Sequence, residues 1–89
     1  MAIMRFGVNT WVWTSPLTTD EFAKLAPLVA SLGFDWIEVP LENLGDLDSR
    51  RGGEIAQAHG LGVSCCAAMG PDRDLIHAEQ TVRDSGMAY

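Results

Sequence analysis

Three groups of residues in this chain are candidates for carrying chemistry, and each group lies on or just after a run of strand-forming residues. They are Asn9, Trp11 and Trp13; Glu38 and Glu42; and Cys66 to Gly70. Aromatic rings beside an amide can form the wall of a pocket for a sugar, because the rings stack on the apolar faces of the sugar. Ordinary packing of the two indoles in the core or in a loop is an equal alternative. Glu42 is expected to be a solvated loop acid.

Glu38 is an acid within a run of strand-forming apolar residues, where a buried position is expected. It lies between Ile37 and Val39 in a strand-forming run from Phe34 to Glu42. Successive strand residues point to opposite faces, so Ile37 and Val39 should pack under helices while Glu38 points to the other face. There the carboxylate could hydrogen-bond a substrate or a group near a metal ion. The alternative is a structural carboxylate that is satisfied by Lys, Arg or backbone groups of neighbouring strands.

The two cysteines, Cys65 and Cys66, are adjacent, so they lack the two-residue spacer of a metal-binding or redox pair. Neighbouring strand residues point to opposite faces, and we therefore expect two reduced thiols that act as small packing residues. His77 has no acids at ligand spacing. Neither a nucleophile triad nor a phosphate-binding loop is evident in the sequence.

The framework that must position these residues is predicted by the hydrophobic pattern. Segments 4–13, 34–42 and 61–68 favour strands, and the stretches between them favour helices. A strand-helix-strand order predicts parallel strands with crossover helices. We therefore expect an α/β fold made of the first three strand-helix units of a (β/α)8 TIM barrel, as one partial N-terminal domain over residues 1–89. A whole barrel takes about 250 residues, and its active site lies at the C-terminal ends of its strands.

The helices have recognisable ends. Thr18 and Glu21 form a capping box, and Asp48 or Ser49 should cap the second helix. Gly33 supplies a left-handed stop for the first helix. The buried face of that helix is predicted from its three- and four-residue spacing; it comprises Phe22, Leu25, Ala26, Val29 and Leu32.

Composition excludes some classes of partner. The chain has 12 acidic against 6 basic residues and a net charge of -6, which repels phosphate backbones, so we expect no nucleic-acid partner. No apolar run approaches the roughly 20 residues that cross a bilayer, so we expect no membrane partner. The reduced thiols and the absence of a secretory leader pattern predict a cytoplasmic location.

An ordered set of motifs then indicates a family. The motifs are Arg5-Phe-Gly-Val-Asn-Thr-Trp11, Leu32-Gly-Phe-Asp-Trp-Ile-Glu38, His59-Gly-Leu-Gly-Val63, Met69-Gly-Pro71 and Thr81-Val-Arg-Asp-Ser-Gly86. Together they resemble the N-terminal third of the ketose 3-epimerases of the D-tagatose and D-psicose type, within the xylose isomerase-like barrel superfamily. The strand motif that ends in Glu38 is shared across that superfamily, so the order of the whole set carries the resemblance.

The resemblance implies an isomerase that epimerises a free ketose at C3 through an enediolate. It implies a divalent metal, manganese by preference with magnesium or cobalt as alternatives, held by two Glu, one Asp and one His. In the family these residues lie on later strands, so we expect no catalytic residue and no metal ligand before Tyr89, and no activity from this chain alone. The full-length protein is expected to be a homo-oligomer.

This part of such an enzyme would bind the end of the sugar remote from the metal. The resemblance points to Asn9, Trp13 and the end of the third strand at Cys66 or Ala68. Many relatives carry an aromatic residue at the position of Asn9, which leaves the preferred sugar open. With the residues selected above, the candidate substrate-binding set is Asn9, Trp11, Trp13, Glu38, Cys66 and Ala68.

Other functions fit part of this pattern. Hydroxypyruvate isomerase, inosose dehydratase and other sugar-acting relatives open with a similar first strand and a similar Glu38 strand. An endonuclease relative fits less well because the charge is wrong for DNA. A small α/β module without activity is the alternative from a different class, although it would leave strand edges unpaired.

Overall fold

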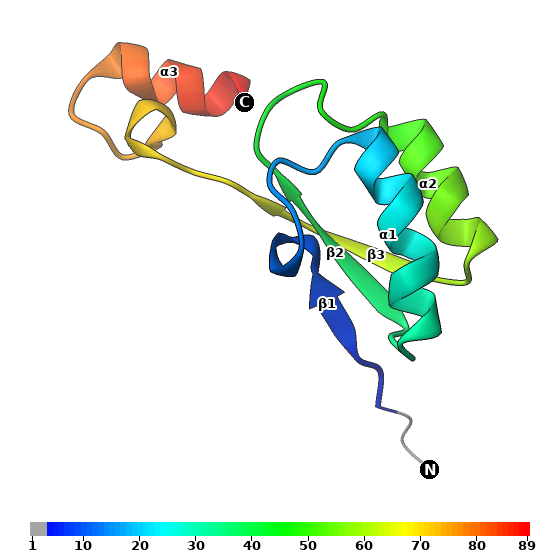
Figure 1. The fold of residues 1–89 in the computed structure, drawn as a ribbon. Coiled ribbons are helices and arrows are strands. Elements are labelled where there is room, and N and C mark those ends of the chain that lie inside the picture. The colour runs from blue at the N-terminus through cyan, green and yellow to red at the C-terminus, as the bar shows by residue number, and fades with distance from the viewer. Residues whose placement is uncertain (1–3) are drawn as a thin grey trace.

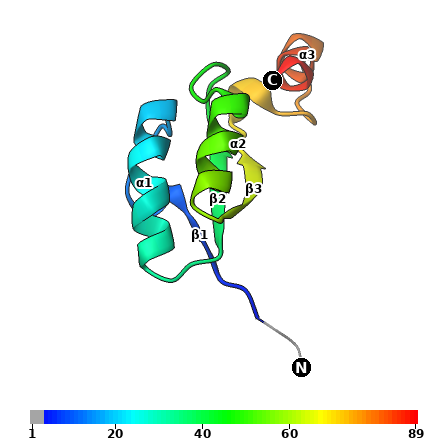
Figure 2. The same ribbon diagram turned by 90° about the vertical axis from the view of Figure 1, so that its right-hand side faces the viewer.

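The structure, a computed structural model, describes residues 4–89 and has three parallel strands in the order β1-β2-β3. Two helices, α1 and α2, lie on one face of this sheet, and a third helix, α3, lies beyond one end of it (Figures 1 and 2). The elements are β1 Gly7–Asn9, a 3-10 turn at Thr10–Val12, α1 Thr19–Ser31, β2 Trp36–Leu41, α2 Ser49–Ala58, β3 Gly62–Ala67, a 3-10 turn at Pro71–Arg73 and α3 Gln80–Ala88. The predicted strand-helix order and parallel pairing are confirmed.

The core lies between the sheet and the two helices. Ile37 and Val39 of β2 are almost fully buried, whereas Glu38 between them lies on the opposite face. This confirms the assignment of the strand faces. The helices and loops complete the core with Leu17, Phe22, Leu25, Ala26, Val29, Ile55, Ala56 and Leu61.

The predicted helix ends are largely confirmed. Thr18 Oγ1 accepts the backbone N–H of Glu21 at 3.2 Å, but the Glu21 carboxylate lies 3.7 Å from Lys24 Nζ instead of reaching back to the cap. Gly33 has a φ of 92°, as a left-handed stop requires. The prediction for Leu32 was wrong. Leu32 is the C-cap of α1 and is 57% exposed, so the buried face of the helix ends at Val29.

The first strand is shorter than predicted. Asn9 Oδ1 accepts the backbone N–H of Trp11 at 2.8 Å, and this side-chain bond favours a 3-10 turn over further strand pairing. At α2 the cap is Asp48, whose carboxylate accepts the backbone N–H of Arg51 at 3.0 Å. In both places a side-chain oxygen caps the helical turn that follows it.

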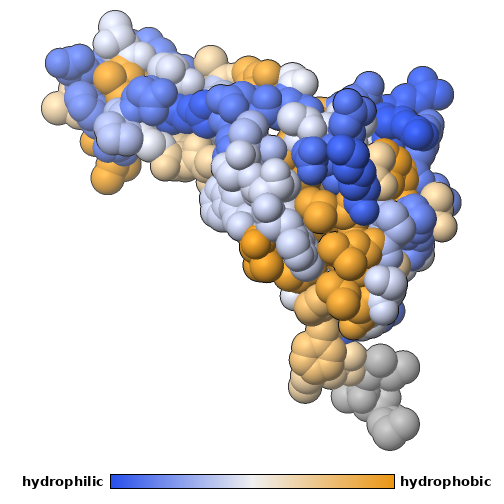
Figure 3. Space-filling view, in the orientation of Figure 1, coloured by the Kyte–Doolittle hydropathy of each residue, from blue (hydrophilic) through white to orange (hydrophobic). Residues whose placement is uncertain are grey.

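The third strand is covered less well than β2. Val63, Cys65 and Ala67, which point to the helix side of the sheet, are all exposed. The reason is visible in Figure 1, where α3 (orange to red) packs beside the second 3-10 turn, beyond the end of the sheet. Apolar surface is also exposed beside β1 (Figure 3). Within residues 4–89, no helix is both long and apolar enough to span a membrane.

Candidate functional site

The open face of the sheet, opposite α1 and α2, carries a row of polar side chains near the C-terminal ends of the strands. The strand register places Asn9 level with Glu38, and Glu38 level with Ser64. Cys66 lies two residues further along β3 on the same face. Residues from three separate parts of the sequence thus meet at the end of the sheet where active sites of (β/α)8 barrels are built.

Glu38 is the centre of this polar cluster. Asn9 Nδ2 donates to Glu38 Oε1 at 2.9 Å, and Ser64 Oγ donates to Glu38 Oε2 at 3.4 Å. The alternative of a structural carboxylate satisfied by neighbouring strands is compatible with these bonds, but its expected partners, Lys, Arg or backbone groups, are replaced by two neutral side chains. The two carboxylate oxygens offer about four acceptor positions, so two donors leave capacity for the hydroxyl groups of a ligand.

Cys66 belongs to the same cluster. Asn9 Nδ2 lies 3.6 Å from Cys66 Sγ. Burial raises the pKa of the Cys66 thiol and the nearby negative charge of Glu38 acts in the same direction, while the contact with Asn9 opposes them. Cys65 points to the other face and, like Cys66, is a free thiol. Cys65 is exposed, so the packing role predicted for it was wrong.

The first loop is tied to the end of β2 by Glu42. Trp11 Nε1 and Ser15 Oγ each donate to Glu42 Oε1 at 2.6 Å. Glu42 is a half-buried loop acid, and in addition to facing solvent it binds two donors of the first loop. Trp11 is 47% exposed and Trp13 is 37% exposed, which excludes the core alternative for both indoles.

Two residues that contact the segment after β3 were not predicted from the sequence: Arg73 in the second 3-10 turn and Tyr89 after α3. Arg73 Nη1 donates to the carbonyl oxygens of Glu42 and Ala68, and the guanidinium lies 4.0 Å from the centroid of the Tyr89 ring. The backbone N–H of Ala68 donates to Tyr89 Oη at 3.2 Å. These contacts span from 5 to 31 positions along the chain, so only the folded structure brings them together.

The structure therefore joins most, but not all, of the predicted residues. Asn9, Glu38 and Cys66 make direct contact, and Trp11 is linked to them through the side chain of Asn9. Ala68 lies at the rim, where its backbone is bound by Arg73 and Tyr89. Trp13 makes a local contact: its backbone N–H donates to the carbonyl of Thr10.

The residues present do not fit a divalent metal ion. Across residues 4–89, no three or more His, Cys, Asp or Glu side chains lie together in a group that could hold one. A metal needs several oxygen or nitrogen ligands that converge on one point. The polar cluster around Glu38 and Asn9 can bind hydroxyl groups. The partly exposed indole of Trp11 lies in the loop that follows Asn9.

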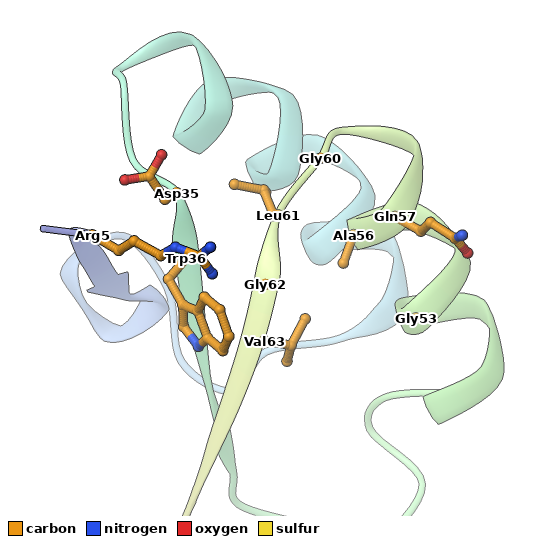
Figure 4. Close-up of a pocket in the computed structure, with 10 residues that line it drawn as sticks. All are labelled: Arg5, Asp35, Trp36, Gly53, Ala56, Gln57, Gly60, Leu61, Gly62 and Val63. Atoms are coloured by element: carbon orange, nitrogen blue, oxygen red, sulfur yellow. The ribbon is translucent and has the colours of Figure 1, made fainter. Parts of the chain in front are cut away.

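Another cavity lies at the other end of the sheet. It measures about 580 Å³. Its lining comes from the N-terminal ends of β2 and β3 and from α2, and it includes the Trp36 indole (Figure 4). In parallel barrels this end contributes to stability, and catalysis belongs to the opposite end. We therefore place the candidate site at Glu38.

Comparison with known proteins identifies the fold. No protein-family model matches the sequence. The D-allulose 3-epimerase from Methylomonas sp., solved in complex with D-allulose, matches with a TM-score of 0.82 at 18% identity over 93% of this chain and 29% of its own. An L-ribulose 3-epimerase matches with a TM-score of 0.82 at 26% identity over 97% and 29%. A D-psicose 3-epimerase solved in the presence of D-fructose matches with a TM-score of 0.76 at 22% identity over 96% and 30%.

The chain thus spans less than a third of the length of each of these proteins. Its three strand-helix units have the fold of part of a ketose 3-epimerase, which confirms the resemblance and the partial-barrel fold class.

Proposed function

We propose that this chain is the N-terminal, sugar-binding part of a ketose 3-epimerase, and that residues 1–89 form the first three units of its barrel domain. The substrate is a free ketose, and the site residues in this part are Asn9, Trp11, Trp13, Glu38, Cys66 and Ala68. The observation that carries the proposal is the contact of Asn9 with Glu38 and Cys66 across three adjacent strands whose fold matches ketose 3-epimerases.

Each residue has a role that follows from its chemistry. Glu38 accepts hydrogen bonds from the ketose hydroxyls remote from the reacting carbon, since Asn9 and Ser64 leave part of its acceptor capacity free. Asn9 orients that carboxylate from the next strand. Trp11 and Trp13 offer indole faces to the apolar side of the sugar, and Cys66 and Ala68 give the pocket a small, largely neutral wall.

Proton transfer at C3 is not performed by these residues. The divalent metal implied by the family would polarise the ketose carbonyl, and its ligands together with the acid and base belong to other parts of such a barrel. The contribution of this part is binding and orientation, which reduce the entropic cost of reaching the reactive geometry.

The test is a comparison of variants of the complete gene product, supplied with Mn²⁺ and assayed with D-allulose, D-fructose and L-ribulose. In Glu38→Gln the loss of the charge weakens the hydrogen bonds to the sugar, and we expect KM to rise about tenfold. Asp35→Asn is the matched control, because Asp35 is an exposed acid just before the other end of β2, and its carboxylate accepts the backbone N–H of Phe6.

The control should leave KM unchanged. Equal KM values in the parent and Glu38→Gln would contradict the role of Glu38 in sugar binding.

A further inference from the structure

Arg73 makes an unusual set of contacts for a surface loop residue. Its Nη1 donates to the main-chain carbonyls of Glu42 and Ala68, and its Cζ lies over the Tyr89 ring, 4.0 Å from the ring centroid. The ion pairs among residues 4–89 involve Lys24, Arg50 and Arg51. The charge of Arg73 is therefore stabilised by carbonyl dipoles and an aromatic face.

The two carbonyls that Arg73 binds are the first ones beyond the sheet. Glu42 directly follows β2, which ends at Leu41, and Ala68 directly follows β3, which ends at Ala67. The last ladder bond runs from the backbone N–H of Ala68 to the carbonyl of Leu41 at 3.0 Å. Arg73 thus continues the connection between β2 and β3 past the point where backbone pairing stops.

The same contacts reach the first loop and the last helix. Glu42, whose carbonyl is bound by Arg73, holds the Trp11 indole and Ser15 through its carboxylate. Tyr89, at the end of α3, accepts the backbone N–H of Ala68 through its hydroxyl, and its ring contacts the guanidinium of Arg73. One cation therefore links the loops that follow β1, β2 and β3.

We propose that Arg73 is a positioning residue that fixes the rim of the ligand pocket, holding the Trp11 indole and the Ala68 backbone in place. The role of Arg73 is inferred from the contacts described above. The identification of the ligand as a ketose rests on the proposed function. Arg73 touches neither a substrate nor the reacting atoms. Its effect is exerted through Glu42 on Trp11 and through direct contact on Ala68.

The test uses Arg73→Met in the complete gene product. The aliphatic side chain keeps much of the volume but loses both carbonyl bonds and the contact of its charge with Tyr89. The loss should raise KM for the ketose about tenfold with kcat little changed, because binding remote from the reacting carbon is made equally in the ground and transition states. The ¹⁵N–¹H resonance of the Trp11 indole, assigned with Trp11→Phe, should move as well.

Arg83 provides a matched control. Its Nη1 also donates to two carbonyls, those of His77 and Ala78 at 2.7 and 2.9 Å, but these belong to the turn just before α3. Arg83→Met therefore removes the same chemistry without touching the ends of the strands. It should leave the KM and the Trp11 resonance as in the parent.

Equal effects of Arg73→Met and Arg83→Met on KM and on the Trp11 resonance would overturn the proposal. If Arg73→Met does not fold, Arg73→Lys takes its place, since it keeps the charge but lacks the planar fork and stack. A KM and a Trp11 resonance that match the parent in Arg73→Lys would also overturn it. If the parent turns over no ketose, the proposed function fails, and the Trp11 resonance alone decides the role of Arg73.

Discussion

At the scale of single residues, the pairing of Glu38 with neutral partners determines what the site can do. A carboxylate held by one amide and one hydroxyl keeps part of its acceptor capacity for a ligand. The sequence indicates that Glu38 faces away from the helices, because strand alternation alone decides this. It could not reveal Asn9 and Ser64 as partners, since they come from strands 29 and 26 positions away and the register is fixed only when the sheet forms.

The pKa of the Cys66 thiol depends in part on the charge of Glu38. Burial and this charge raise the pKa of the thiol, so its reactive thiolate forms at higher pH than in an ordinary cysteine. In Glu38→Gln one of these causes is removed, and we expect the pH profile of Cys66 alkylation by iodoacetamide to shift to lower pH. Peptide mass spectrometry resolves the two thiols. Cys65, on the opposite face, should alkylate at an unchanged rate, and a shift of both profiles together would contradict the local origin of the effect.

At the scale of secondary-structure elements, sequence patterns predicted the framework better than the site. The caps at Thr18 and Asp48 and the stop at Gly33 act within a few residues, so local chemistry reveals them. Burial on β3 could not be predicted from the strand itself. Val63 and Cys65 are exposed because α3 packs beyond the sheet, which depends on the path of the chain after Ala68.

The packing of the three strands depends on small residues beside one indole. Trp36 is level with Gly7 on β1 and with Gly62 on β3, and a Cβ built at Gly62 would lie 2.1 Å from the indole ring. We expect Gly62→Ala to lower the free energy of unfolding by at least about 1 kcal/mol, because the indole must move. Denaturant unfolding of the complete gene product measures this change.

Gly53→Ala provides the comparison for that measurement. Gly53 lies inside α2, and a Cβ there would meet no other atom within 4 Å. Alanine should raise the free energy of unfolding by about 0.5 to 1 kcal/mol, because it has less backbone freedom to lose on folding. Equal effects of the two substitutions would argue against close packing of Trp36 on Gly62.

At the scale of the whole molecule, residues 4–89 expose strand edges and apolar side chains that no other described segment covers. Within the described part, β1 and β3 each pair only with β2, so one edge of each strand has no strand partner. Large apolar side chains such as Phe6, Val12 and Ile76 are more than half exposed. Unpaired edges next to apolar surface favour association between chains.

This surface leads to a prediction for a protein made of residues 1–89 alone. We expect it to self-associate in sedimentation equilibrium as its concentration rises, and to show no Mn²⁺-dependent epimerisation of ketoses, because residues 4–89 hold no group of metal ligands. A monomer with a sharp cooperative melt would contradict the first expectation. Turnover of a ketose by this chain would contradict the second.

The central claim is that this chain is the sugar-binding part of a ketose 3-epimerase, and hydrogen exchange at C3 tests it most directly. The complete gene product, supplied with Mn²⁺, is incubated with D-allulose, D-fructose or L-ribulose in D₂O, and deuterium at each carbon is followed by NMR. An enediolate route predicts deuterium at C3 together with formation of the C3 epimer. A folded, metal-supplied protein that leaves the C3 proton of all three sugars in place would contradict the claim.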